Sequence, residues 1–315
     1  MVDVSKKFTV NSAEADTKAI ISRHKLFDNL FAVLGIVALS IALITLSALV
    51  IKLGIDGAGR ISPEFFTSFP SRFAEKAGIL SAWVGTLLVM LVTAFTATTI
   101  GVAAGIYLEE YAPKNWFAEL IEINIANLAG VPSIVYGLLA LGLFVYQFKL
   151  GTSVLTAGLT LALLVLPIVI VSTREAMRSV PRSIHEASYA LGATKWQTMQ
   201  DHILPYSLGG ILTGIIIALS RAIGETAPLI TIGALTFIAF LPDPPLSTTF
   251  PFISFQWLMS PFTVMPIQMF NWTSRPQEAF QVNAAAAGLV LLVMTLSINA
   301  VAIYLRASFR KRIKW

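Results

Sequence analysis

The chain has 315 residues, of which 56% are apolar and only 12% are charged, and its formal net charge is +5. Because about a quarter of the residues of a soluble domain are charged, this composition excludes an ordinary soluble protein and indicates an integral membrane protein. The absence of cysteine excludes disulfides, thiol chemistry and cysteine-ligated metal sites.

Six apolar segments are long enough to cross a membrane as helices, since about 30 Å of hydrocarbon is crossed at about 1.5 Å per residue. None of them shows the alternation of a strand, so the sequence predicts an all-α membrane protein with six transmembrane helices. We place these helices at residues 29–51, 79–108, 123–146, 150–171, 208–240 and 282–304.

The distribution of Lys and Arg predicts the orientation of these helices. With both termini in the cytoplasm, fifteen of these cations lie inside and six outside. The prediction is a cytoplasmic N-terminal tail (1–26), a membrane domain (27–306, with its core at 79–306) and a basic cytoplasmic tail (307–315). We expect the basic N-terminal cluster to bind membrane lipid and no nucleic acid.

Two loops between these helices differ in composition. The acidic loop at 109–122 contains an Ala-Pro break and is predicted to be an interfacial turn. The external loop at 241–281 is rich in proline and aromatic residues, which is typical of a structured loop along the outer interface.

The cytoplasmic loop at 174–206 carries two predicted capping boxes. Ser183 and Glu186 have the spacing of the first box, which predicts that a helix begins at Ile184. Thr194 and Gln197 have the spacing of the second box. Between the two helices, Gly192 occupies the place of a left-handed C-terminal residue, and Pro205 should interrupt the second helix.

This helix pair has three possible interpretations. It is either a small docking surface for a partner or a pair of amphipathic helices that lies on the bilayer. A DNA-binding helix-turn-helix is disfavoured, because the loop is tethered between two spans and only Arg182 and Lys195 are nearby cations.

The fifth predicted span contains a charged pair. Arg221 and Glu225 are four residues apart and therefore share one helix face. Charges at this depth usually face protein or water and mark a transport path, although a structural ion pair is the alternative. Gly224 is expected to permit close approach of a neighbouring helix, and Pro228 to kink the span.

The chemistry of this pair suits an oxyanion. The planar guanidinium of Arg221 can donate two hydrogen bonds to phosphate, and Glu225 can pair with Arg221 when the path is empty. Glu225 can also accept the proton of a monohydrogen phosphate. Further candidates to line the path are Thr226 and, in the third span, Ser133 and Tyr136, although the latter two could equally bond to neighbouring helices.

Motifs for other functions are absent from the sequence. No Gly-x-x-x-x-Gly-Lys-Ser/Thr segment occurs, so this chain should not hydrolyse ATP by itself. His185-Glu186 is not followed by the second histidine of a zinc hydrolase. A serine hydrolase based on Ser133 would need a nearby base, but His24, His185 and His202 are predicted on the cytoplasmic side. A stand-alone channel or secondary transporter stays open as an alternative.

The segment Glu186-Ala-Ser-x-x-x-Gly192, followed by Leu204-Pro205, resembles the EAA loop of bacterial ABC-importer permeases. It departs from that pattern at Ser188, where alanine is usual, and at His202. The resemblance implies a type I importer permease fold and a loop that docks on a separate ATPase. The residues expected to couple this chain to the ATPase are Ser183, Glu186, Ala187, Gly192, Thr194 and Lys195.

A more specific resemblance rests on three segments: Arg221-Ala-Ile-Gly-Glu-Thr-Ala-Pro-Leu229, Gly130-Val-Pro-Ser-Ile-Val-Tyr-Gly137 and Ser172-Thr-Arg-Glu-Ala-Met-Arg-Ser-Val-Pro181. Together they resemble the phosphate-importer permeases of the PstA family. The resemblance implies a non-catalytic subunit of an ATP-driven phosphate importer in a bacterial inner membrane. It implies a partner permease PstC, two copies of the ATPase PstB and the phosphate-binding protein PstS. ATP and Mg²⁺ would bind to the ATPase, with no cofactor in this subunit. Sulfate and molybdate permeases are the nearest alternatives.

Overall fold

The computed structural model of the chain describes residues 4–244 and 254–312. All the regular secondary structure in these ranges is helical, which confirms the predicted all-α class. The chain divides into two units, residues 1–55 and 56–315.

The first unit is formed by helix α1 (Val4–Gly57), whose last two residues belong to the second unit, and this helix carries the first predicted span. The helix is continuous from Val4, so the predicted N-terminal tail is helical and continues directly into the span. Polar side chains in the span satisfy themselves locally: the hydroxyls of Ser40 and Thr45 each donate to a carbonyl one turn earlier, at 2.8 Å. Such internal bonding suits a helix surrounded by hydrocarbon, where water cannot supply partners.

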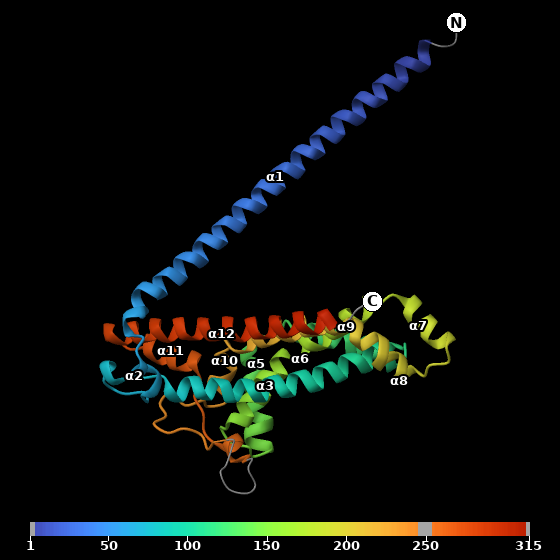
Figure 1. The fold of residues 1–315 in the computed structure, drawn as a ribbon. Helices are drawn as coiled ribbons and strands as arrows, with labels where there is room; N and C mark the ends of the chain where they lie inside the picture. Colours follow the sequence, from blue (N-terminus) through green and yellow to red (C-terminus); the bar gives the residue numbers. More distant parts are fainter. Residues whose placement is uncertain (1–3, 245–253, 313–315) are drawn as a thin grey trace. The chain divides into compact units, whose positions relative to one another are not determined.

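The second unit contains the remaining helices, α2 to α12, joined by turns, by longer loops and, among the described residues, by three wider π-helical segments (Tyr107–Tyr111, Leu141–Gln147 and Met199–Ile203). The helices are α2 (Pro63–Thr67), α3 (Leu80–Ile106), α4 (Trp116–Leu128), α5 (Ser133–Ala140), α6 (Val154–Arg178), α7 (Arg182–Ala190), α8 (Lys195–Thr198), α9 (Leu204–Ala222), α10 (Ala227–Thr231), α11 (Met265–Thr273) and α12 (Glu278–Arg312). Within this unit, α7 and α8 lie at one end, and α2 and α11 lie at the other (Figure 1).

Five helices of the described residues are long and apolar enough to cross a membrane, or six if the bent pair formed by α4 and α5 is one span. Helix α3 matches a predicted span within two residues, and α6 and α12 cover most of two others but end seven and eight residues beyond the predicted bounds, at Arg178 and Arg312. The predicted six-span class is therefore supported in number, but two of the spans differ in shape.

Helix α6 forms the centre of the second unit and packs against both α3 and α9. Small residues allow the close approach. A Cβ atom on Gly101 of α3 would lie 2.7 Å from Val169 of α6, and Gly158 of α6 packs directly on Val92 of α3. Because lipid and leucine are equally apolar, such close backbone packing is the main source of helix association in a membrane.

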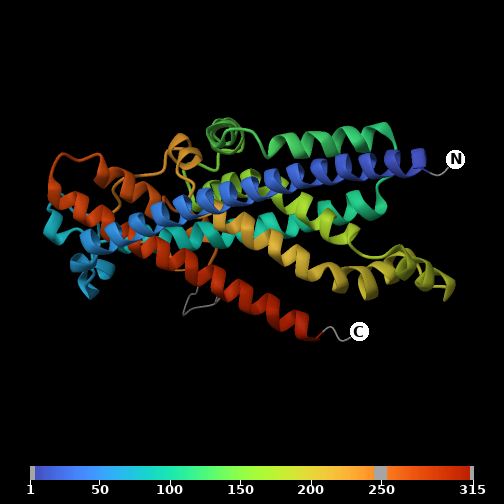
Figure 2. The same ribbon diagram turned by 90° about the horizontal axis from the view of Figure 1, so that it is seen from above.

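The prediction of one straight third span at residues 123–146 is wrong. The chain instead forms α4 and α5, which are bent by 108° relative to each other. Figure 2 shows one of these two green helices along its length and the other end-on. Pro132 explains the break, because its ring disfavours helical geometry at the preceding residue. The Tyr136 hydroxyl then donates to the carbonyl of Leu128 at the end of α4, at 2.7 Å.

The prediction of one fifth span at residues 208–240, kinked at Pro228, is also wrong. Helix α9 ends at Ala222, a non-helical turn follows, and Pro228 lies in the first turn of the short helix α10. A proline is well tolerated there, since the amides of a first turn have no helical partner. Gly224 permits no close packing, because the nearest atom to a Cβ built on it is the Arg221 carbonyl oxygen at 3.9 Å.

The start of α9 differs from the prediction as well. Pro205 was expected to interrupt the chain, but it lies in the first turn of α9, directly after the π-helical segment Met199–Ile203. The helical path from α8 into α9 is therefore unbroken.

The end of the unit that carries α2 and α11 is organised by Arg60. Its Nε donates to Asn283 at the start of α12, at 2.9 Å, and its guanidinium donates to the carbonyls of Glu75 and Ala77. Trp272 of α11 is fully buried beside Phe65 of α2. The predicted structured loop at 241–281 thus contains a packed helix, α11, while its residues 245–253 lie outside the described part of the chain.

Candidate functional site

Two segments that are distant in the sequence, residues 130–137 and 221–229, are in contact in the structure. Gly137 of α5 lies against α10: a Cβ atom there would overlap the Thr231 hydroxyl and lie 2.7 Å from the Cα atom of Pro228. The segment that ends at Gly137 and the segment that ends at Leu229 are therefore in direct backbone contact. Only glycine permits this approach, because any other residue would push α5 and α10 apart.

The Arg221–Glu225 pair lies beside this junction. The Nε atom of Arg221 is 3.3 Å from a carboxylate oxygen of Glu225, and the two side chains are 40% and 19% exposed. The predicted pairing is thus present, although Glu225 lies in the turn beyond the last residue of α9. Arg221 in the last helical turn also faces the negative end of the helix dipole, which stabilises a cation.

The other predicted path residues surround the same turn. Tyr136 is buried, and the charge of Arg221 lies close enough to act on its hydroxyl. Since this hydroxyl donates to Leu128, Tyr136 holds the break between α4 and α5 in place. Ser133 is the first residue of α5, and Thr226 directly precedes α10. The structure therefore brings the segments of all five path candidates to one region.

The predicted coupling residues lie on α7, on α8 and on the connection between them. Gly192 has a φ of +82°, which confirms the predicted left-handed residue. Glu186, Ala187, Thr194 and Lys195 are all exposed. Two large apolar side chains beside them are also exposed, Leu191 by 89% and Trp196 by 62%. These exposed apolar side chains suit either of the two uses predicted for the helix pair, docking on a partner or contact with the bilayer.

One predicted capping box is present and the other is not. Thr194 accepts from the amide of Gln197, and the Gln197 side chain accepts from the amide of Thr194 at 2.8 Å. The box at Ser183 and Glu186 is wrong, because α7 begins at Arg182 with Pro181 before it and carries no side-chain cap. Proline already fixes the backbone for a helix start. Glu186 is thus not needed to begin α7.

Ser188 has a partner inside the helix pair. Its hydroxyl and that of Thr198 are 2.8 Å apart, and both residues are buried between α7 and α8. This position is where the EAA pattern has alanine, so the departure from the pattern adds a hydrogen bond between the two short helices. His202, the second departure, is half-buried in the π-helical segment that leads into α9.

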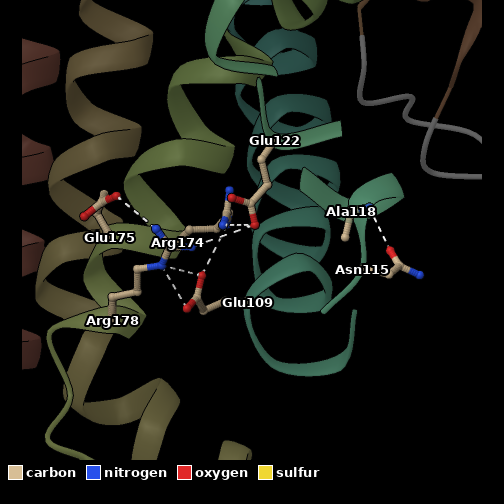
Figure 3. Close-up of polar contacts among 7 residues, drawn as sticks. All are labelled: Glu109, Asn115, Ala118, Glu122, Arg174, Glu175 and Arg178. Carbon is tan, nitrogen blue, oxygen red and sulfur yellow. Dashed lines mark hydrogen bonds and ion pairs between the residues drawn. The ribbon is translucent and has the colours of Figure 1, made fainter. Parts of the chain in front are cut away.

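A buried ion-pair network was missed from the sequence. Arg174 of α6 is only 6% exposed and pairs with Glu109, at 3.3 Å, and with Glu122 of α4. Arg178, one turn later, pairs with Glu109 at 2.8 Å. Figure 3 shows both arginines directed at the two carboxylates. The network joins the end of α3, the first half of the bent span and α6.

The sequence indicates only part of this ion-pair network. Arg174 and Arg178 are four residues apart and share a helix face, and the loop opposite them is acidic. The pairing itself joins residues more than 50 positions apart, which no local pattern determines. Asn115 adds local order to the loop, because its side chain accepts from the amide of Ala118 and begins α4 (Figure 3).

The end of α3 also contacts the helix pair. A carboxylate oxygen of Glu110 is 3.6 Å from Nε2 of His185, and the Lys195 ammonium lies 5.0 Å from the ring centre of Tyr111. Partial burial raises the pKa of Tyr189, and the charge of Glu110 and a hydrogen bond to it raise this pKa further. The phenol therefore stays protonated and donates to Glu110 at physiological pH.

The geometry defines a class of protein. A bundle of membrane helices with an exposed helix pair at one end, and a charged pair at a broken span, is the architecture of a transport component. A family model described as "Binding-protein-dependent transport system inner membrane component" matches residues 97–315. The chain belongs to this family and is a multi-pass protein of the inner membrane, and such a component functions with a substrate-binding protein and an ATPase.

Individual relatives agree with this family. The phosphate transport system permease protein PstA of Yersinia pestis is 35% identical over 267 residues, which are 82% of this chain and 81% of that protein. The probable ABC transporter permease protein YqgI of Bacillus subtilis is 30% identical over 251 residues, which are 78% and 84%. A structure of the MetNI methionine ABC transporter in an inward facing conformation aligns with a TM-score of 0.56 and 17% identity, over 71% of this chain and 93% of that chain. This likeness confirms the predicted importer permease fold.

Proposed function

We propose that this chain is a permease subunit of an ATP-driven importer of inorganic phosphate, with Arg221 and Glu225 in the translocation path. The observation that carries the proposal is the Arg221–Glu225 pair, which lies at the junction of α5, α9 and α10 in a membrane domain. The similarity to PstA of Yersinia pestis supports phosphate as the substrate.

The chemistry of the pair suits transient binding of phosphate. Arg221 donates from a planar fork that matches two phosphate oxygens. Glu225 competes for the same guanidinium, since its carboxylate oxygen lies 3.3 Å from Nε of Arg221, and so prevents Arg221 from retaining the anion. Glu225 also accepts a hydrogen bond from the hydroxyl of monohydrogen phosphate, a group that sulfate and molybdate lack. Tyr136, Ser133 and Thr226 line the remainder of this path.

The partners in this proposal follow the family resemblance. A second permease, PstC, completes the path, and PstS delivers phosphate from outside. Two copies of PstB bind ATP and Mg²⁺ and hydrolyse the nucleotide, so this subunit holds no cofactor. The surface of α7 and α8 docks on PstB through Ser183, Glu186, Ala187, Gly192, Thr194 and Lys195. The exposed Leu191 and Trp196 supply apolar area to that interface.

Transport by the complete complex tests the function. Purified complexes with wild-type or Arg221→Gln subunits are reconstituted in vesicles, and ATP-dependent uptake of labelled phosphate is measured. The loss of one charge-assisted fork should lower the initial rate by at least about tenfold. Arg306→Gln, a half-buried cation near the end of α12, is the matched control and should transport normally.

Three results would contradict the proposal. Wild-type rates with Arg221→Gln would remove Arg221 from the path. Competition by sulfate or molybdate as strong as that by unlabelled phosphate would indicate another oxyanion. Uptake in vesicles that lack the ATPase would instead support a stand-alone channel or a secondary transporter.

A further inference from the structure

A cavity of about 620 Å³ lies between the end of α3, the end of α6 and α7. It is separate from the Arg221–Glu225 pair, and none of the proposed steps of transport uses it. Four cations line it against two carboxylates: Lys114, Arg178, Arg182 and Lys195 against Glu109 and Glu110. Its volume lies within the range of small-molecule sites, which is about 300 to 1,000 Å³.

The two carboxylates already have partners on the protein. Glu109 is held by Arg174 and Arg178, and Glu110 faces His185 and Tyr189. In contrast, neither Lys114 nor Arg182 makes an ion pair with any residue that the structure describes. The cavity therefore contains uncompensated positive charge next to neutralised negative charge.

His185 provides a further unsatisfied group. Its Nε2 atom faces Glu110, whereas its Nδ1 atom is buried and has no hydrogen-bond partner among the residues of 4–244 and 254–312. Because Nδ1 is buried, the imidazole ring forms part of the cavity wall and donates nothing to a ligand there. Met177 and Val180 form an apolar floor beneath these polar groups.

We propose that this cavity binds a phosphate-bearing anion, either free inorganic phosphate or the headgroup of an anionic phospholipid. Lys114 and Arg182 donate to its oxygens. The bound anion joins the turn after α3 to the first residue of α7. The inference depends on the proposed function only for the side of the membrane, since α7 and α8 are there assigned to the ATPase.

Thermal stability of the assembled complex tests the binding. The complex is placed in nanodiscs of phosphatidylcholine, without ATP, and its melting temperature is measured as inorganic phosphate replaces chloride at constant ionic strength. A ligand that binds only the folded state raises the melting temperature. The double variant Lys114→Gln/Arg182→Gln should need about tenfold more phosphate for the same shift, since two charge-assisted bonds are lost. Arg306→Gln is the control and should respond as the wild type does.

A second lipid composition separates the two sources of the anion. In nanodiscs that contain phosphatidylglycerol, a headgroup ligand should stabilise the wild type relative to the double variant before any phosphate is added. An advantage of the wild type in either arm supports the proposal and identifies the ligand. Equal melting temperatures of wild type and double variant in both arms would overturn it. Because ATP is absent, this result is independent of whether the complex transports phosphate in the uptake assay.

Discussion

At the scale of single residues, Arg174 is the side chain that depends most on its partners. The fold removes it almost completely from solvent and compensates its charge with carboxylates from two other elements. A buried charge of this kind depends on its partners, because an unpaired ion in a medium of low dielectric constant is very costly. Arg178 pairs with the same groups, but its side chain is 46% exposed and water can replace its partners.

Arg174→Gln should therefore destabilise the complex by about 3 to 5 kcal/mol, because Glu109 and Glu122 lose their buried partner. The melting temperature followed by fluorescence-detected size-exclusion chromatography measures the effect. Arg178→Gln is the matched control and should cost less than about 1 kcal/mol, as exposed ion pairs usually do. Equal shifts for the two variants would show that the burial of Arg174 carries no energetic weight.

The two ion-pair systems also show which single-residue interactions the sequence could predict. Arg221 and Glu225 are four residues apart, and this short separation predicted their pairing even though Glu225 lies in the turn beyond α9. Arg174 and Glu109 come from different helices, and their pairing depends on how α3 and α6 pack. The acidic loop alone could not identify its partner.

At the scale of elements, the junction of α5 and α10 depends on a single glycine. Gly137→Ala would place a methyl group on Thr231 and Pro228, and at least one of the two helices would have to move. Such overpacking costs about 1 to 3 kcal/mol, and more where backbone must shift. Because the displaced turn carries Glu225, we expect a loss of ATP-dependent phosphate uptake in vesicles.

Gly142→Ala supplies the control for this experiment. Gly142 follows α5 in the π-helical segment, and a Cβ atom there would have no neighbour within 4 Å. Its substitution should change uptake and melting temperature little, by less than about 0.5 kcal/mol. The importance of the junction would be refuted by normal uptake with Gly137→Ala.

The N-terminal caps of α7 and α8 can be tested separately. Thr194 caps α8 in the structure, whereas Ser183 caps nothing on α7. Thr194→Ala should cost about 1 kcal/mol of local stability, which corresponds to about fivefold faster hydrogen exchange in the amides of α8. Ser183→Ala should leave the exchange of α7 unchanged, and mass spectrometry of the complex distinguishes the two. Equal effects of the two substitutions on hydrogen exchange would show that Ser183 caps α7 after all.

The elements that the sequence misplaced share one cause. Apolar composition predicts how much chain is buried in the membrane, and it located α3, α6 and α12 well. It does not report whether an apolar stretch stays straight. The breaks after Leu128 and Ala222 depend on Pro132, on the acceptor for Tyr136 and on the packing of Gly137, and these are tertiary effects.

At the scale of the whole molecule, the predicted orientation of the chain in the membrane rests on the Lys and Arg distribution and is directly testable. The absence of native cysteine makes single-cysteine labelling clean. We expect a membrane-impermeant maleimide to label Ser71→Cys in intact cells. It should label Ser5→Cys and Ser308→Cys only after permeabilisation, because both termini are predicted to be cytoplasmic. Labelling of either terminus in intact cells would contradict this topology.

The unbroken path from α8 into α9 has a mechanical consequence. Helix α9 contains 19 residues and ends at Ala222, and the Ser220 hydroxyl near this end donates to Asn299 of α12 at 2.6 Å. At about 1.5 Å per residue it is about 28 Å long, so a tilt of about 10° at α8 would displace Arg221 by about 5 Å. Glu225 belongs to the turn that leads into α10, which Gly137 holds against α5. A tilt of α9 would therefore move the guanidinium of Arg221 away from the carboxylate of Glu225, and the salt bridge between them would open.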